Sequence, residues 1–208
     1  MRSDARRNRD RIVRVTRALV LERGAHVPME EIAREAEVGV GTVYRHFPDR
    51  YHLLRAVAVL NLTWAAEEAE TAAREETDSW QAFARLVRRA VERGLGDPVP
   101  LVRPVLAAHA GSDEVFLRAQ ARTTTAVGAL LARAQADGVV RADVTVADVL
   151  VLVTARPDPG SFLGEPAAAV LAERCLRVLL DGLRPRPDGE PPLPGDVDVD
   201  AALRPDGR

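Results

Sequence analysis

A short polar row near residue 45 has the residue types that contact nucleic acids. The row consists of Thr42, Tyr44, Arg45 and His46. Hydroxyl and phenol groups donate hydrogen bonds to phosphates, and an arginine fork can pair with the two acceptors of guanine in the major groove. The structural alternatives are that Tyr44 packs half into a core and that His46 lies on the surface without a role. The combination favours a surface that binds DNA.

Two short helices joined by a tight turn are expected to position this row. The apolar residues at helical spacing are Ile32, Ala33 and Ala36 before the turn and Val43 and Phe47 after it. The two helices can therefore share one small core, with the polar row facing away from it. The pattern predicts a helix-turn-helix.

The remaining apolar periodicity is helical as well. Helices are predicted to end at Gly24, to run over 28–36 and 41–47, to continue through Leu53 to about Glu76, and to occupy 78–94, 101–110, 112–137, 146–153 and 166–183. The segment 146–153 is apolar on nearly every side, so we expect it to be buried all round. No alternating strand pattern persists. The predicted fold class is all-α.

Three parts of the chain differ in character. Residues 1–50 are expected to form a helix-turn-helix DNA-binding head, and residues 51–183 a helical body. Residues 184–208 contain six prolines and three glycines with few large apolar side chains. Such a composition cannot bury enough apolar surface to fold, so we predict a disordered tail.

The composition is that of a soluble globular protein, with 47% hydrophobic and 29% charged residues. No run of about 18 apolar residues and no secretory signal is apparent, so a cytoplasmic location is expected. Cys175 is the only cysteine, which excludes an intramolecular disulfide and a cysteine zinc site.

The charge is unevenly distributed along the chain. Residues 1–50 contain 11 arginines and 8 acidic residues, whereas residues 51–208 contain 18 and 23. Seven of the arginines fall among the first 17 residues, which suits binding to a polyanion. A merely solvated helix face is the alternative. The basic head and acidic body favour DNA as the partner of the head.

The sequence gives no support to an enzyme. The four histidines, His26, His46, His52 and His109, form no metal-binding or catalytic spacing, and no phosphate-binding or nucleophile motif occurs. We therefore expect no catalytic residues, no metal site and no cofactor.

The head resembles the TetR family of bacterial transcriptional regulators over residues 11–54. The motifs that carry the resemblance are E-R-G at 22–24, I-A-x-x-A at 32–36 and V-G-V-G-T-V-Y-R-H-F-P at 38–48. The resemblance implies a homodimer formed through the last two helices, 146–153 and 166–183, and a body that encloses a small-molecule pocket. The implied partners are a double-stranded DNA operator and a ligand of unknown identity.

The resemblance also assigns roles to single residues. Val40, Thr42 and Arg45 match base-facing positions, Tyr44 and His46 match phosphate-contacting positions, and Arg50 matches the basic residue that begins the fourth helix. Arg7 represents the basic N-terminal arm. The candidates for polar pocket residues are Asn61, Trp64, His109, Gln120 and Thr123, and the alternative for each is an ordinary core or surface residue.

Two departures from the family pattern stand in the head. Glu37 occupies a turn position where the family usually has glycine with positive φ, and a left-handed conformation there would cost roughly 1–2 kcal/mol. Val27 and Pro28 stand where a threonine commonly caps the second helix and contacts a phosphate. The sequence thus predicts a strained or altered turn and one phosphate contact fewer.

Taken together, these features predict a sequence-specific transcriptional regulator, a repressor that a small-molecule ligand releases from a near-palindromic operator. The alternative is an architectural DNA-binding protein that ignores sequence. For that role, however, a helical body of roughly 130 residues without strong positive charge would be superfluous.

Overall fold

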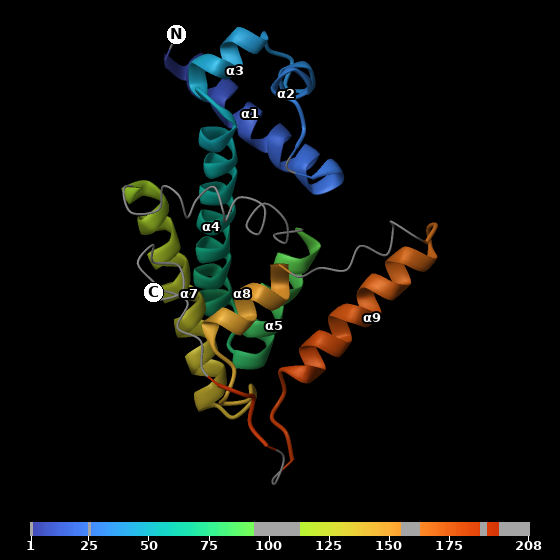
Figure 1. The fold of residues 1–208 in the computed structure, drawn as a ribbon. Coiled ribbons are helices and arrows are strands. Elements are labelled where there is room, and N and C mark those ends of the chain that lie inside the picture. Colours follow the sequence, from blue (N-terminus) through green and yellow to red (C-terminus); the bar gives the residue numbers. More distant parts are fainter. Residues whose placement is uncertain (1, 25, 94–112, 155–162, 188–190, 196–208) are drawn as a thin grey trace.

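The computed structural model describes residues 2–24, 26–93, 113–154, 163–187 and 191–195. Every regular element in these ranges is a helix, so the all-α prediction is confirmed. A small head of three helices sits at one end of a long helix, and the other helices surround the far part of that helix (Figure 1). The predicted helix over 101–110 lies outside the described residues.

The head consists of α1 (Arg2–Arg23), α2 (Met29–Glu35) and α3 (Val40–His46). Its core also includes the first turns of α4. The buried residues are Ile12, Val13, Leu19, Val27, Met29, Ile32, Ala33, Ala36, Val43, Phe47, Leu53, Ala56 and Val57. As the apolar spacing predicts, the two short helices share this core.

The body is built on α4 (Arg50–Glu75), which leaves the head and packs along α5 (Ser79–Glu92) and α7 (Glu114–Ala136). Small alanines on α4 allow this close approach, and Phe83, Val87 and Leu130 fill the space between the helices. Helix α8 (Val146–Thr154) packs against α5 and α7, and α9 (Ala167–Gly182) contacts α5.

Side-chain caps fix the starts of two body helices, near the starts predicted at residues 78 and 146. Asp78 accepts a hydrogen bond from the backbone N–H of Gln81 at 2.8 Å and begins α5. Thr145 and Asp148 bond reciprocally before α8, at 2.8 Å from the Thr145 N–H and 3.3 Å from the Asp148 N–H. These side chains satisfy N–H groups that have no partner within the helix.

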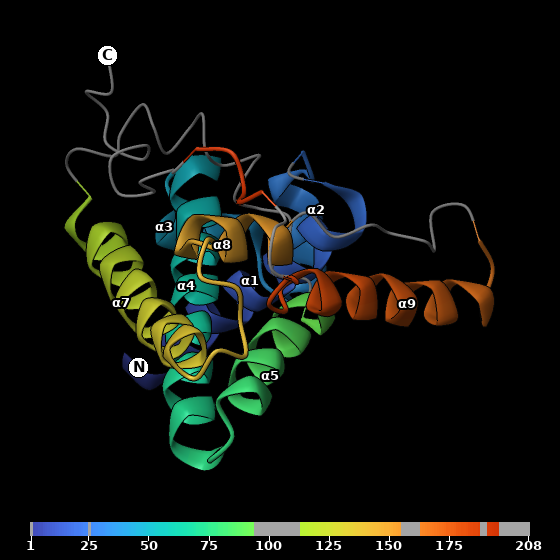
Figure 2. The same cartoon turned by 90° about the horizontal axis from the view of Figure 1, so that it is seen from below.

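The expectation that 146–153 is buried all round is wrong for the single chain. Val151 is 63% exposed and Leu152 39% exposed, and on α9 Val170 and Val178 are 61% and 72% exposed. Helix α9 extends away from the body along most of its length (Figure 2). Apolar periodicity gives the face that must be covered, but not whether the same chain covers it.

Part of the C-terminal tail contacts the body. The backbone N–H of Leu193 donates to Asp143 Oδ2 at 2.8 Å, and its side chain packs against the body core. The carboxylate of Asp143 also pairs with the buried Arg141 at 2.5 Å and 2.6 Å. These contacts, with the Arg141 pair as the main cause, hold the pKa of Asp143 far below its usual range.

Of the two alternatives that the family resemblance left open for the turn between α2 and α3, the structure has the strained one. Glu37 has φ = 52°, in the left-handed region, and its side chain is exposed. Its backbone N–H donates to Arg34 at 3.0 Å, and that of Val38 to Ala33 at 3.0 Å. The turn is therefore well bonded despite a residue type that disfavours it.

We expect Glu37→Gly to stabilise the protein by about 0.5–1 kcal/mol. Relief of the left-handed strain outweighs the larger conformational entropy that glycine has in the unfolded chain. The exposed Glu37–Arg11 pair, 3.8 Å apart, contributes little. Urea unfolding measures the change. In the matched control, Glu35→Gly within α2 should destabilise by up to about 1 kcal/mol; a loss of stability in both variants would contradict the prediction.

Candidate DNA-binding face and regulatory region

Helix α3 presents a polar face to solvent because its opposite face is buried in the head. Val43 is 0% exposed, whereas Val40 and Tyr44 are 40% and 45% exposed. Arg45 is also exposed, and Thr42 and His46 are half-buried. Tyr44 is not among the buried residues of the head core, and the exposed part of its side chain lies on this polar face.

The arginine at the centre of this face is held by its own helix. Arg45 Nη2 donates to Thr42 Oγ1 at 3.0 Å. One turn of helix separates the two residues, so the bond restricts the guanidinium to the exposed side of α3. An oriented fork loses less freedom when it binds the edge of a base.

Arg50 lies at the first position of α4, as predicted, but its side chain is engaged inside the head. Arg50 Nη2 donates to the carbonyl of Val27 at 2.5 Å and lies 3.5 Å from that of His26. The guanidinium therefore ties the start of α4 to the segment before α2. A phosphate contact by Arg50 stays a prediction and would have to share these donors.

The cap of α4 precedes Arg50. Asp49 accepts from the backbone N–H of His52 at 2.9 Å and lies 2.8 Å from its ring nitrogen Nδ1. The backbone hydrogen bond, followed by the ring contact, lowers the pKa of Asp49. An ionised carboxylate at this helix start stabilises the first turn of α4.

The arginines of α1 differ in exposure. Arg6, Arg7, Arg9 and Arg14 are exposed, and Arg9 lies over the ring of Phe47 with 5.3 Å to its centroid. Arg17 instead points to the body. The basic surface predicted from the sequence is therefore smaller than seven arginines suggest.

The predicted pocket residues have different surroundings. Asn61 is buried at 4% exposed and Trp64 is half-buried. Thr123 is buried, and its hydroxyl lies 2.8 Å from the Leu62 carbonyl and 2.9 Å from that of Ala119, so it joins α7 to α4. Gln120 is half-buried. His109 lies outside the described residues.

Asn61 and Trp64 lie together with two arginines that sequence reasoning did not select. Arg17 Nε donates to Asn61 Oδ1 at 2.9 Å, and Arg17 Nη2 donates to the backbone carbonyl of Arg93. The guanidinium of Arg93 lies over the ring of Trp64, 4.8 Å from its centroid. Side chains from α1 and α4 and the residue that ends α5 meet here, where head and body join.

A second contact between elements lies near the same end of α4. The guanidinium of Arg55 forms a bidentate ion pair with Asp113, which also accepts from the N–H of Phe116 at 3.0 Å and so caps α7. Phe116 packs beside Val20 of α1 and Leu54 of α4. The start of α7 is therefore bonded to the start of α4.

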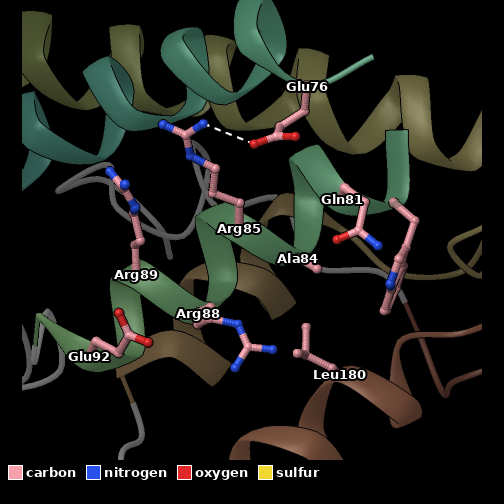
Figure 3. Close-up of a pocket in the computed structure, with 9 residues that line it drawn as sticks. Glu76, Gln81, Ala84, Arg85, Arg88, Arg89, Glu92 and Leu180 are labelled. Carbon is pink, nitrogen blue, oxygen red and sulfur yellow. Dashed lines mark hydrogen bonds and ion pairs between the residues drawn. The ribbon is translucent and has the colours of Figure 1, made fainter. Parts of the chain in front are cut away.

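A groove of about 470 Å³ separates α5 from the end of α9 (Figure 3). Arginines from α5 line it, and carboxylates already neutralise them: Arg85 pairs with Glu68 and Glu76 at 3.0 Å each, and Arg88 lies 3.5 Å from Glu173. In Figure 3, Arg88 extends toward the side of the groove that Leu180 forms. The groove is thus polar and largely charge-balanced.

Within the described ranges, no helix is long and apolar enough to cross a membrane. In the same part of the chain, no three histidine, cysteine or acidic side chains gather as metal ligands would.

Comparisons with known proteins agree with this geometry. The family model described as "Bacterial regulatory proteins, tetR family" matches residues 12–57, and "Transcriptional regulator SbtR-like, C-terminal domain" matches residues 78–185. An HTH-type transcriptional regulator of Staphylococcus aureus strain USA300 is 44% identical over 54 residues, 26% of this chain. The match spans only 29% of that relative.

Solved structures extend the similarity to the body. A TetR transcription regulatory protein from Mycobacterium vanbaalenii is 35% identical with a TM-score of 0.59, covering 88% of this chain and 98% of the other. A TetR transcriptional regulator from Streptomyces coelicolor is 27% identical with a TM-score of 0.56, covering 86% and 99%. With a helix-turn-helix head and a helical body that both match, this chain belongs to the TetR family of bacterial transcriptional regulators.

Proposed function

We propose that this protein is a homodimeric repressor that a small-molecule ligand releases from a near-palindromic operator. The observation that carries the proposal is the outward face of α3, where exposed Val40, Tyr44 and Arg45 project from a helix whose other side is buried. Helix α3 would enter the major groove and read bases with Val40, Thr42 and Arg45.

Phosphate contacts would surround this reading helix. Tyr44 and His46 lie on the same short helix, and Arg7 of α1 is exposed. Pro28, the residue before α2, makes no side-chain cap. With no threonine hydroxyl there to meet a phosphate, affinity would depend more on the exposed arginines of α1.

The exposed apolar residues of α8 and α9 support a dimer through the last two helices. Val151, Leu152, Val170 and Val178 leave apolar surface uncovered on the single chain. A second copy that covers it would remove this surface from water. Two heads related by a two-fold axis would then meet half-sites about one helical turn apart. A chain that sediments as a monomer at micromolar concentration would contradict this.

Arg45→Ala should relax specificity at one base pair in each half-site and cost about 1–3 kcal/mol of binding free energy there. Arg7→Ala should instead weaken binding to all sequences alike and make the dependence of affinity on salt shallower. Fluorescence anisotropy with a set of single-base operator variants, repeated at several salt concentrations, measures both effects.

The source of operator DNA is the region upstream of the protein's own gene, with random DNA of equal length as the control. Equal, equally salt-dependent affinity for both would overturn the repressor and support the architectural alternative. Uniform weakening by Arg45→Ala would mean that this residue contacts phosphate and not a base.

A further inference from the structure

We propose that the junction of head and body binds an oxyanion group, a carboxylate or phosphate of the effector, between Arg17, Asn61 and Arg93. The regulatory meaning of this site rests on the proposed function, but the existence of the site does not. The proposed site implies that the ligand is an acid that is ionised at neutral pH.

The geometry brings hydrogen-bond donors from three elements to one place. Arg17 comes from α1, Asn61 from α4, and Arg93 from the residue that ends α5. The 2.9 Å bond from Arg17 Nε to Asn61 Oδ1 fixes the orientation of the carboxamide. Its Nδ2 group is thereby the remaining donor, and the guanidinium of Arg93 lies over the ring of Trp64.

The charges of this cluster are not balanced within the described residues. In the described part of the chain, carboxylates form ion pairs with Arg55, Arg85, Arg88 and Arg89. Neither Arg17 nor Arg93 forms such a pair. Burial lowers the pKa of both guanidinium groups, and the positive charge of Arg93 lowers that of Arg17 further. Two like charges held together at a half-buried position favour an anion between them.

The polar atoms are unsatisfied as well. Asn61 Nδ2 and Arg93 Nε are buried and have no hydrogen-bond partner, and the Asn61 side chain is 4% exposed overall. Buried donors without acceptors are rare, because each loses its hydrogen bond to water. An oxyanion carries several lone pairs and can accept from Asn61 and from both arginines at once. The arginines of the groove beside α9 lack this need, since carboxylates already pair with them.

The position of the cluster lets a bound anion act on the arrangement of head and body. Arg17 belongs to the head and Arg93 to the body, so an anion bound to both favours one relative placement of the two parts. A ligand shifts a conformational equilibrium only through such a difference in affinity. The effector would thereby alter the separation of the two α3 helices in the dimer.

The first test measures the melting temperature of the full chain without DNA. Sodium hexanoate and sodium phosphate are compared with sodium chloride at equal ionic strength and pH. A probe present at about 100 times its Kd should raise Tm by roughly 5–10 °C. A response to hexanoate alone identifies a carboxylate site, and a response to phosphate alone a phosphate site. No response to either probe overturns the proposal.

Substitutions decide whether the response arises at this cluster. Arg93→Gln should abolish it, whereas Arg88→Gln on the neighbouring α5 surface should retain it. Asn61→Asp replaces the unsatisfied donor with a built-in carboxylate oxygen. It should therefore raise Tm in the absence of any probe and remove the probe response. A lower Tm in Asn61→Asp with an intact response would overturn the site even if Arg93→Gln did not fold.

Operator binding separates this inference from the function on which it rests. If the protein binds its operator but no probe shifts Tm, the proposed anion site is overturned and the proposed repressor function is not. A different result is that a probe raises Tm, that Asn61→Asp abolishes this response, and that no specific operator binding is found. That result supports the anion site and overturns the repressor function. Arg7→Ala, at an exposed arginine of α1 proposed to contact DNA phosphate, should keep the response, which excludes anions bound where phosphates of DNA would bind.

Discussion

Asp113→Ala is expected to lower the free energy of unfolding by about 3 kcal/mol. The side chain of Asp113 is only 6% exposed, and its carboxylate forms a bidentate ion pair with Arg55. Removal of one partner leaves the other charge partly buried without compensation, which costs about 3–5 kcal/mol in a dry environment. Because 24% of the Arg55 side chain reaches solvent, the lower end of that range applies.

The same substitution removes the cap of α7. Asp113 accepts from the N–H of Phe116 at 3.0 Å, and loss of a cap costs about 1 kcal/mol, which we include in the total. Thermal or urea unfolding of the full chain measures the change. Asp113→Asn should recover the cap but not the ion pair, because asparagine caps as well as aspartate.

Asp78→Ala is the matched control. Asp78 caps α5 with a bond of 2.8 Å and is exposed, without an ion pair among the described residues. It should cost only about 1 kcal/mol. Equal losses in the Asp78 and Asp113 variants would show that the ion pair between α4 and α7 contributes nothing to stability.

Features that depend on neighbours in sequence could be predicted. Gly24 has φ = 82° at the predicted end of α1, and Asp78 and Asp148 form capping bonds near the helix starts predicted at residues 78 and 146. The positive φ of Glu37 is one of the two outcomes that the family resemblance implies, since the family usually has glycine with positive φ at this turn position. Local geometry decides each of these features.

Features that depend on distant contacts could not be predicted. Arg17 is indistinguishable in sequence from the six other arginines before residue 18, and only its contact with Asn61, 44 residues away, separates it from them. Its neighbour Arg93 stands at a helix end, a common place for an exposed arginine. The hydrogen bond from Arg50 to the Val27 carbonyl is likewise a tertiary contact that the sequence does not reveal.

The exposure of Val151 and Leu152 illustrates another limit. A helix that is apolar all round predicts complete burial, yet the single chain leaves one side of α8 in solvent. Sequence periodicity reports how much apolar surface must be covered. Whether the cover comes from the same chain or from a second copy depends on the fold.

Phe47→Ala is expected to lower the free energy of unfolding of the head by about 3–5 kcal/mol and to abolish DNA binding. Phe47 is 2% exposed and directly follows α3, and the other buried residues of this core are aliphatic residues and Met29. Loss of the ring leaves a cavity that these neighbours fill only in part, which gives the cost. The exposed face of α3 would then have no rigid support.

Hydrogen exchange resolves where the damage lies. We expect protection to fall in α1, α2 and α3 while the amides of α5 and α7 stay protected, because the body has its own core around Phe83. Uniform loss of protection would contradict a head that opens separately from the body.

Tyr44→Ala separates folding from recognition on the same helix. Tyr44 is 45% exposed, so its removal should change stability by no more than about 0.5 kcal/mol. If it contacts a phosphate, the variant should bind operator more weakly while the head keeps its hydrogen-exchange protection. A loss of stability close to that of Phe47→Ala would instead place Tyr44 in the core. The contrast between these two residues, three positions apart, therefore tests whether α3 presents one face to the core and the other to DNA.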